Sequence, residues 1–152
     1  MSQYFLRVPE KDGVATPVIG KNSEQFSYAD PVTIDSNGFL ARATSSGEKI
    51  YGFALEDVTM ASDNQTVAKY KPAVCPVDGA VMVYTADQAV TQTDIGAYAD
   101  IGTSTSGGFI LNFAAGATGQ FFVQGFDPNN DGTTTLAIVR VAEPQYLAFA
   151  QS

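Results

Sequence analysis

The residues best suited to chemistry lie in the stretch "FDPNNDGTTTLAIVRV". Asp127, Asn129, Asp131 and Gly132 occupy the first, third, fifth and sixth positions of a calcium-binding loop. The twelfth residue of such a loop is a glutamate that gives two oxygens to the ion. Here that residue is Ile138, and β-branched residues stand where the exiting helix of the loop should begin. We therefore interpret the stretch as a tight turn that leads into a strand.

Paired carboxylates could catalyse glycoside hydrolysis without histidine. The candidate acidic residues for this role are Glu56, Asp57, Asp78, Asp94, Asp127 and Asp131. Most of them stand beside Gly, Pro or Asn, where aspartate is commonly a turn former. Glu56 and Asp57 are adjacent, so a strand would point them to opposite faces. Because no spacing forces two carboxylates to converge, we expect a protein that is not an enzyme. An enzyme would need such convergence.

Histidine is absent, and Cys75 is the only cysteine. A chain without histidine has no Ser–His–Asp or Cys–His machinery and lacks the usual zinc ligands. We expect Cys75 to be a small, semi-buried apolar residue, and we expect no cofactor and no metal.

Charge and hydropathy limit the kinds of partner that the chain is expected to bind. The chain has 16 acidic and 8 basic residues, a net charge of −8, and no basic run. Such a chain repels the phosphate backbone, so we expect no nucleic-acid partner.

The N-terminus has no apolar signal segment. The most apolar stretch, residues 107–126, is interrupted by Asn112, Gln120 and Gln124. We therefore expect a soluble protein made in a cytoplasm, with no membrane partner.

Short runs of β-branched and aromatic residues, separated by 14 glycines and 7 prolines, predict an all-β fold. We expect an antiparallel β-sandwich or a small β-barrel with one short helical turn and an extended N-terminal arm. The clearest hairpin is residues 31–43, where Asn37-Gly38 predicts a type I′ turn. The next strand is residues 49–58, with a bulge expected at Gly52.

The remaining elements follow from the same patterns. Residues 65–85 contain two strand-like runs that are joined at Asp78-Gly79. Prolines in the first run restrict it to an edge strand or a bend. A capping box formed by Thr91 and Asp94 predicts the helical turn. The last strands are expected at 109–113, 120–126 and 133–141.

The chain divides into an extended arm over residues 1–28 and a single β-rich domain over residues 29–152. The arm could order against a partner, or it could be an ordinary edge strand followed by a loop. The C-terminal tail carries further apolar residues. Our candidate interface residues are Tyr4, Phe5, Leu6, Val8, Tyr146, Leu147 and Phe149.

Two segments resemble the decoration, or cement, proteins of tailed-bacteriophage heads. These are "ADPVTIDSNGFLARATSSGEKIYGFALEDV" (29–58) and "AVTQTDIGAYADI" (89–101), and "DGTTTLAIVRV" (131–141) is compatible with the last strand of that family. Together they cover about a third of the chain. The chain is longer than the small decoration proteins, and its Phe-rich segment 109–126 departs from them.

The resemblance implies a structural protein on the capsid exterior of a virion. Such proteins bind the major capsid protein, often as homotrimers at local three-fold positions, and stabilise the shell. The strand Tyr4–Val8 could add to the sheet of a neighbour. The alternative is a low-copy vertex or tail component that binds a glycan, in which case Tyr98, Phe122 or Tyr146 would be stacking platforms.

Overall fold

The computed structural model describes residues 3–7, 16–103, 109–113 and 119–142. The strands within them are β1 (Tyr4–Arg7), β2 (Gln25–Phe26), β3 (Pro31–Ile34), β4 (Leu40–Arg42), β5 (Gly52–Ala54), β6 (Val58–Thr59), β7 (Val74–Pro76), β8 (Val81–Thr85), β9 (Tyr98–Thr103), β10 (Phe109–Asn112), β11 (Phe121–Gly125) and β12 (Leu136–Val141). All pairings between these strands are antiparallel. The predicted all-β class is therefore confirmed.

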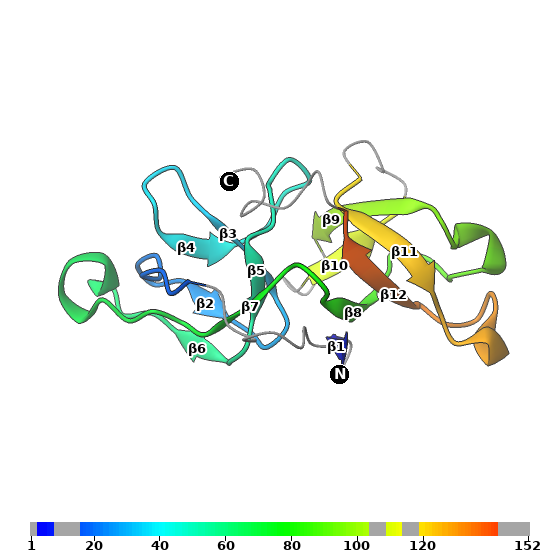
Figure 1. The fold of residues 1–152 in the computed structure, drawn as a ribbon, viewed down its shortest axis with the longest axis horizontal. Coiled ribbons are helices and arrows are strands. Elements are labelled where there is room, and N and C mark those ends of the chain that lie inside the picture. The colour runs from blue at the N-terminus through cyan, green and yellow to red at the C-terminus, as the bar shows by residue number, and fades with distance from the viewer. Residues whose placement is uncertain (1–2, 8–15, 104–108, 114–118, 143–152) are drawn as a thin grey trace.

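The largest sheet has the strand order β1-β8-β12-β11-β9-β10. Figure 1 shows β8 to β12 in one half of the molecule, with β1 beside β8. The sheet curls. This is shown by an isolated bridge that joins Ala86, just after β8, to Leu111 in β10. The strand β10 therefore returns toward the end of β8, whereas β1 lies at the other edge.

A four-stranded sheet, β4-β3-β5-β7, forms the other half with the short pair β2-β6. Its side chains alternate between two apolar clusters, as the period of a strand requires. Phe53 and Cys75 face the large sheet, while Ala54 and Val74 join the cluster that includes β2 and residues packed beside β6. The four-stranded sheet is thus the middle layer of a sandwich.

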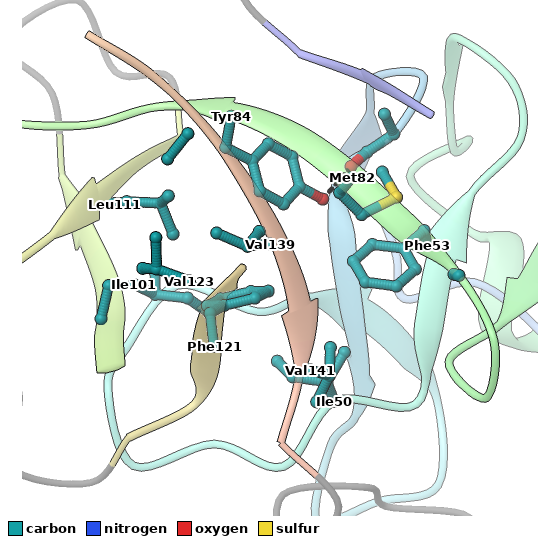
Figure 2. Close-up of a cluster of buried hydrophobic side chains, with 14 of the residues drawn as sticks. Ile50, Phe53, Met82, Tyr84, Ile101, Leu111, Phe121, Val123, Val139 and Val141 are labelled. Carbon is teal, nitrogen blue, oxygen red and sulfur yellow. Dashed lines mark hydrogen bonds between the residues drawn. The ribbon is translucent and has the colours of Figure 1, made fainter. Parts of the chain in front are cut away.

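The main core lies between the large sheet and the middle layer (Figure 2). At its centre is Tyr84, which is fully buried and touches Phe53, Phe109 and Phe121 with ring centroids 4.4–6.3 Å apart. Full burial of a large apolar side chain contributes about 1.5–3 kcal/mol. This aromatic cluster therefore holds the two halves of the chain together.

The predicted hairpin at 31–43 is present, but its predicted turn type is wrong. β3 pairs with β4, yet Gly38 has φ = 89° and Asn37 does not take a positive φ. A type I′ turn needs both residues at positive φ. Instead Asp35 Oδ1 accepts hydrogen bonds from the backbone N–H of Asn37 and of Phe39, both at 2.9 Å. The aspartate side chain therefore shapes a longer loop.

The predicted bulge at Gly52 is also wrong, because the pairing of β5 with both neighbours is regular there. A Cβ at Gly52 would collide with the carbonyl oxygen of Cys75 and with Val74 Cγ1. The glycine therefore permits a close approach between β5 and β7.

Three short helical turns occur in the described residues: η1, a π-helical turn (Asn64–Ala68), and two 3-10 turns, η2 (Gln92–Asp94) and η3 (Pro128–Asn130). η2 is the predicted turn, and Asp94 accepts from the Thr91 N–H at 2.7 Å as the capping box requires. η1 occupies the start of the run at which an edge strand or a bend was expected, and later in the same run β7 forms an edge strand of the four-stranded sheet. Its buried residue Asn64 donates to the Gly20 carbonyl at 2.7 Å and accepts from the Tyr70 N–H at 2.8 Å.

Candidate interaction surface on the six-stranded sheet

The strand β1 presents apolar side chains at the edge of the large sheet. Tyr4 pairs with Val83 of β8, and its side chain is 40 % exposed. Leu6 is 54 % exposed, while Phe5 points inward and its ring lies 6.1 Å from that of Phe53. β1 pairs with β8 on one side, and no strand within the described residues pairs with its other side. That side offers backbone hydrogen-bonding groups to a further strand.

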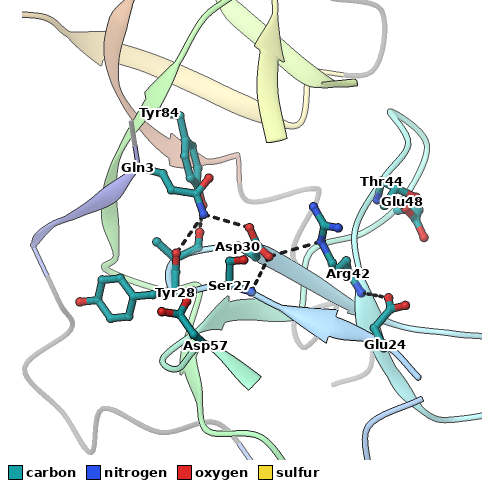
Figure 3. Close-up of polar contacts among 11 residues, drawn as sticks. Gln3, Glu24, Ser27, Tyr28, Asp30, Arg42, Thr44, Glu48, Asp57 and Tyr84 are labelled. Atoms are coloured by element: carbon teal, nitrogen blue, oxygen red, sulfur yellow. Dashed lines mark hydrogen bonds and ion pairs between the residues drawn. The ribbon is translucent and has the colours of Figure 1, made fainter. Parts of the chain in front are cut away.

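A polar cluster fastens the start of β1 to the middle layer (Figure 3). Gln3 Nε2 donates to Asp30 Oδ1 and to the Tyr28 carbonyl, both at 2.9 Å. Asp30 Oδ2 accepts from the Ser27 N–H at 2.8 Å and lies 3.3 Å from Arg42 Nε. Asp30 is only 3 % exposed, and these partners replace the water that a buried carboxyl group loses.

The neighbouring phenol Tyr84 ties this cluster to the core. Burial raises the pKa of Tyr84 well above its ordinary value, and the nearby Asp30 carboxylate raises this pKa further. The phenol therefore stays neutral, and its hydroxyl donates a hydrogen bond to the Ala29 carbonyl oxygen. One buried network thus connects β8, the start of β3 and the residue that precedes β1.

The outward face of the large sheet carries a second feature, a row of three side chains on adjacent strands. Phe122 of β11 pairs with Tyr98 of β9 on one side and with Arg140 of β12 on the other. The Tyr98 and Phe122 ring centroids are 5.6 Å apart, and Arg140 Cζ lies 4.7 Å from the Phe122 centroid. Tyr98 is 49 % exposed. We call Tyr98, Phe122 and Arg140 the aromatic row.

The predicted turn at Asp127 is confirmed. Asp127 Oδ1 accepts from the Asn129 N–H at 3.0 Å, and Oδ2 accepts from Asn130 Nδ2 at 2.7 Å. Asp131 Oδ1 accepts from the Gln92 N–H at 3.0 Å, and Gly132 has φ = 74°. These carboxylates organise the loop around η3 and its contact with η2.

The other paired acids have structural partners too. Glu56 accepts from the Tyr70 hydroxyl at 2.8 Å and from the Ala73 N–H at 2.9 Å. Asp57 accepts from the Tyr28 N–H at 2.7 Å. Within the described residues, no three His, Cys, Asp or Glu side chains gather to hold a metal ion.

The structure places only part of the predicted interface. Tyr4 and Leu6 point outward, whereas Phe5 packs against the core and against the Tyr28 ring at 5.2 Å. The predicted residues Val8, Tyr146, Leu147 and Phe149 lie outside the described residues. Sequence reasoning missed Gln3 and Asp30, because their contact joins residues far apart in the chain. It also missed that Tyr98 and Phe122 are neighbours.

No protein-family model matches this sequence, and no curated protein matches it either. No helix in the described part of the chain is long and apolar enough to cross a membrane.

Proposed function

We propose that this chain is a decoration protein of a tailed-phage head, which binds the capsid exterior as a homotrimer and stabilises contacts between major capsid proteins. The observation that carries the proposal is the edge strand β1, with its exposed Tyr4 and Leu6 and with one side that no strand of the described residues pairs with. The resemblance of residues 29–58 and 89–101 to decoration proteins points to the same function. The all-β sandwich is compatible with it.

The mechanism that this geometry supports is strand addition. A strand of a capsid protein, or of a second copy, pairs with the open side of β1 through backbone hydrogen bonds. Tyr4 and Leu6 then become buried against the partner, and each fully buried apolar side chain contributes about 1.5–3 kcal/mol. The contact is modest for one copy, but icosahedral symmetry repeats it over the shell.

The polar cluster prepares β1 for this contact. Gln3 is held by Asp30 and by the Tyr28 carbonyl, and Phe5 is held by the core. A strand that is already ordered loses less conformational freedom on binding. We therefore assign to Gln3 and Phe5 the role of positioning Tyr4 and Leu6.

The charge of the chain fits an outer location. A net charge of −8 is unfavourable next to packaged DNA. The same negative charge helps to keep the free protein soluble before it binds the exterior of the head.

The test is co-sedimentation of the purified protein with phage heads from the same source. Leu6→Lys and Tyr4→Lys place a charge on the proposed contact, and because both side chains are exposed, the fold should persist. We expect each variant to bind at least tenfold more weakly. The matched control is Val67→Lys, which changes an apolar side chain that is 71 % exposed in η1 and should bind normally. Normal binding by folded Leu6→Lys and Tyr4→Lys would refute strand addition by β1.

A further inference from the structure

The geometry points to the aromatic row as a binding site for a carboxylated saccharide, separate from the β1 contact. Tyr98, Phe122 and Arg140 come from β9, β11 and β12, whereas the proposed attachment to a head uses β1. The saccharide site is therefore a function in addition to that attachment.

The row is ordered before any ligand arrives. Register pairing puts the three residues side by side, and each neighbour restrains the next. Tyr98 also packs against Gly119, where a Cβ would lie 3.3 Å from Tyr98 Cδ1. The guanidinium of Arg140 lies against the Phe122 ring as a cation–π pair. Little side-chain freedom therefore remains to be lost on binding.

The charge of the row selects the ligand. Arg140 is exposed, and none of the described residues forms an ion pair with it, although the chain has twice as many acids as bases. A guanidinium in this state can receive a carboxylate through two parallel hydrogen bonds. Arg42, by contrast, is already paired with Asp30. The row thus offers a cation that is held by Phe122 and has no ionic partner among the described residues.

The half-exposed Tyr98 ring supplies the second element of recognition. An aromatic ring offers a flat apolar surface with a negative face, on which the C–H-rich face of a sugar ring can stack. Gln124 is exposed in β11, at the irregularity between Val123 and Gly125, and its amide can form hydrogen bonds with hydroxyl groups. An apolar ring face, hydroxyl groups and one carboxylate are together the features of a uronic or sialic acid.

The size of the site favours a saccharide over a protein. Three adjacent strands span about 10 Å, because neighbouring strands lie about 4.8 Å apart. That width suits a short oligosaccharide. A stable protein partner needs about 800 Å² of surface on each side, and the apolar residues of the neighbouring strands β8 and β12, such as Val83 and Ile138, are largely covered.

The test is a ligand-observed NMR titration at low salt. The probes are oligogalacturonate, oligomannuronate and sialyllactose, each compared with its methyl ester, which removes only the charge. We expect the wild-type protein to bind at least one acid more tightly than its ester. Arg140→Gln should remove that preference, and Tyr98→Ala should weaken both forms at least tenfold.

Two matched variants are the controls. Tyr70→Ala removes a tyrosine of similar exposure, 45 %, outside the row, and Lys71→Gln removes an exposed cation outside it. Both should bind normally. The proposal is overturned if the folded protein binds none of the acids, if acid and ester bind equally, or if Tyr98→Ala has no effect. Binding of an acidic protein that Arg140→Gln abolishes, without binding of any of the saccharides, would also overturn it. None of these results depends on binding to heads.

Discussion

Asp30 is the residue on which the joint between β1 and the middle layer depends most. It is a nearly buried carboxylate whose partners come from β4, from the turn before β3 and from the residue before β1. Removal of one member of a buried charged pair leaves the other without compensation. Arg42 keeps 28 % side-chain exposure, which reduces this penalty.

We expect Asp30→Ala to lower the free energy of unfolding by about 2–4 kcal/mol, measured by urea denaturation. The control is Asp63→Ala, because Asp63 is exposed and its side chain makes no capping hydrogen bond. This variant should change the free energy of unfolding by less than about 0.5 kcal/mol. Equal, small losses in both variants would show that the polar cluster contributes nothing to stability.

Cys75 provides a second test at the residue scale. Burial raises the pKa of its thiol from 9.0 to about 11. The thiolate is the reactive form, so we expect native protein at pH 8 to resist a thiol reagent that labels the urea-unfolded chain rapidly. Rapid labelling of the native protein would contradict the packing of Cys75.

The same pKa shift has a defined sign in stability. Below pH 9.0 the thiol is protonated in both the folded and the unfolded chain, so its contribution is fully present. As pH rises toward about 11, the unfolded chain loses the proton first and stability falls. Cys75→Ala should reduce this loss between pH 9 and 11 in unfolding measurements.

At the scale of elements, the close approach of β5 and β7 is the most restrictive contact. Gly52→Ala would place a Cβ against the Cys75 carbonyl, so we expect a loss of about 2–3 kcal/mol in the free energy of unfolding. Gly47→Ala is the matched control, because nothing lies within 4 Å of its added Cβ. Equal stability of the two variants would refute the register between β5 and β7.

The turn at η3 gives the second prediction at this scale. Asp127→Ala removes the side chain that accepts from the Asn129 N–H, so we expect a loss of about 1 kcal/mol. Calcium should not raise the Tm of the wild-type protein, because the carboxylates of this loop hold backbone and amide groups. A rise in Tm with calcium that Asp127→Ala abolishes would restore the ion-site interpretation.

Local patterns explain which elements were predictable. The capping box at η2 and the hairpin of β3 and β4 depend on residues close together in sequence, and both were predicted. The shape of the hairpin loop was missed, because Asp35 competes with the expected Asn-Gly turn by binding two backbone N–H groups. η1 was missed because Asn64 is fixed partly by Gly20, a contact that spans 44 residues.

The candidate surface was predictable to a similar extent. The sequence suggested an edge strand at residues 4–8, but it did not separate the outward Tyr4 and Leu6 from the inward Phe5. Tyr98 and Phe122 were recognised as aromatic residues that could stack, yet their adjacency follows from the pairing of β9 with β11. Long-range register is the information that the sequence patterns lacked.

At the scale of the whole molecule, the curled sheet gives the chain two unlike edges. β10 returns toward β8 through the Ala86–Leu111 bridge, while the far side of β1 has no strand partner in the described residues. An open edge invites pairing with another chain. This edge and the aromatic row on the outer face are the two surfaces that we propose for assembly and for a ligand.

The measurement that tests the central claim most directly is quantitative mass spectrometry of purified phage particles from the source, reported as copies of this chain per copy of the major capsid protein. The decoration function predicts a ratio near parity, because the protein would cover the lattice. A few copies per particle would contradict that function in favour of a vertex or tail component. Absence from the particles would contradict any structural role in the virion.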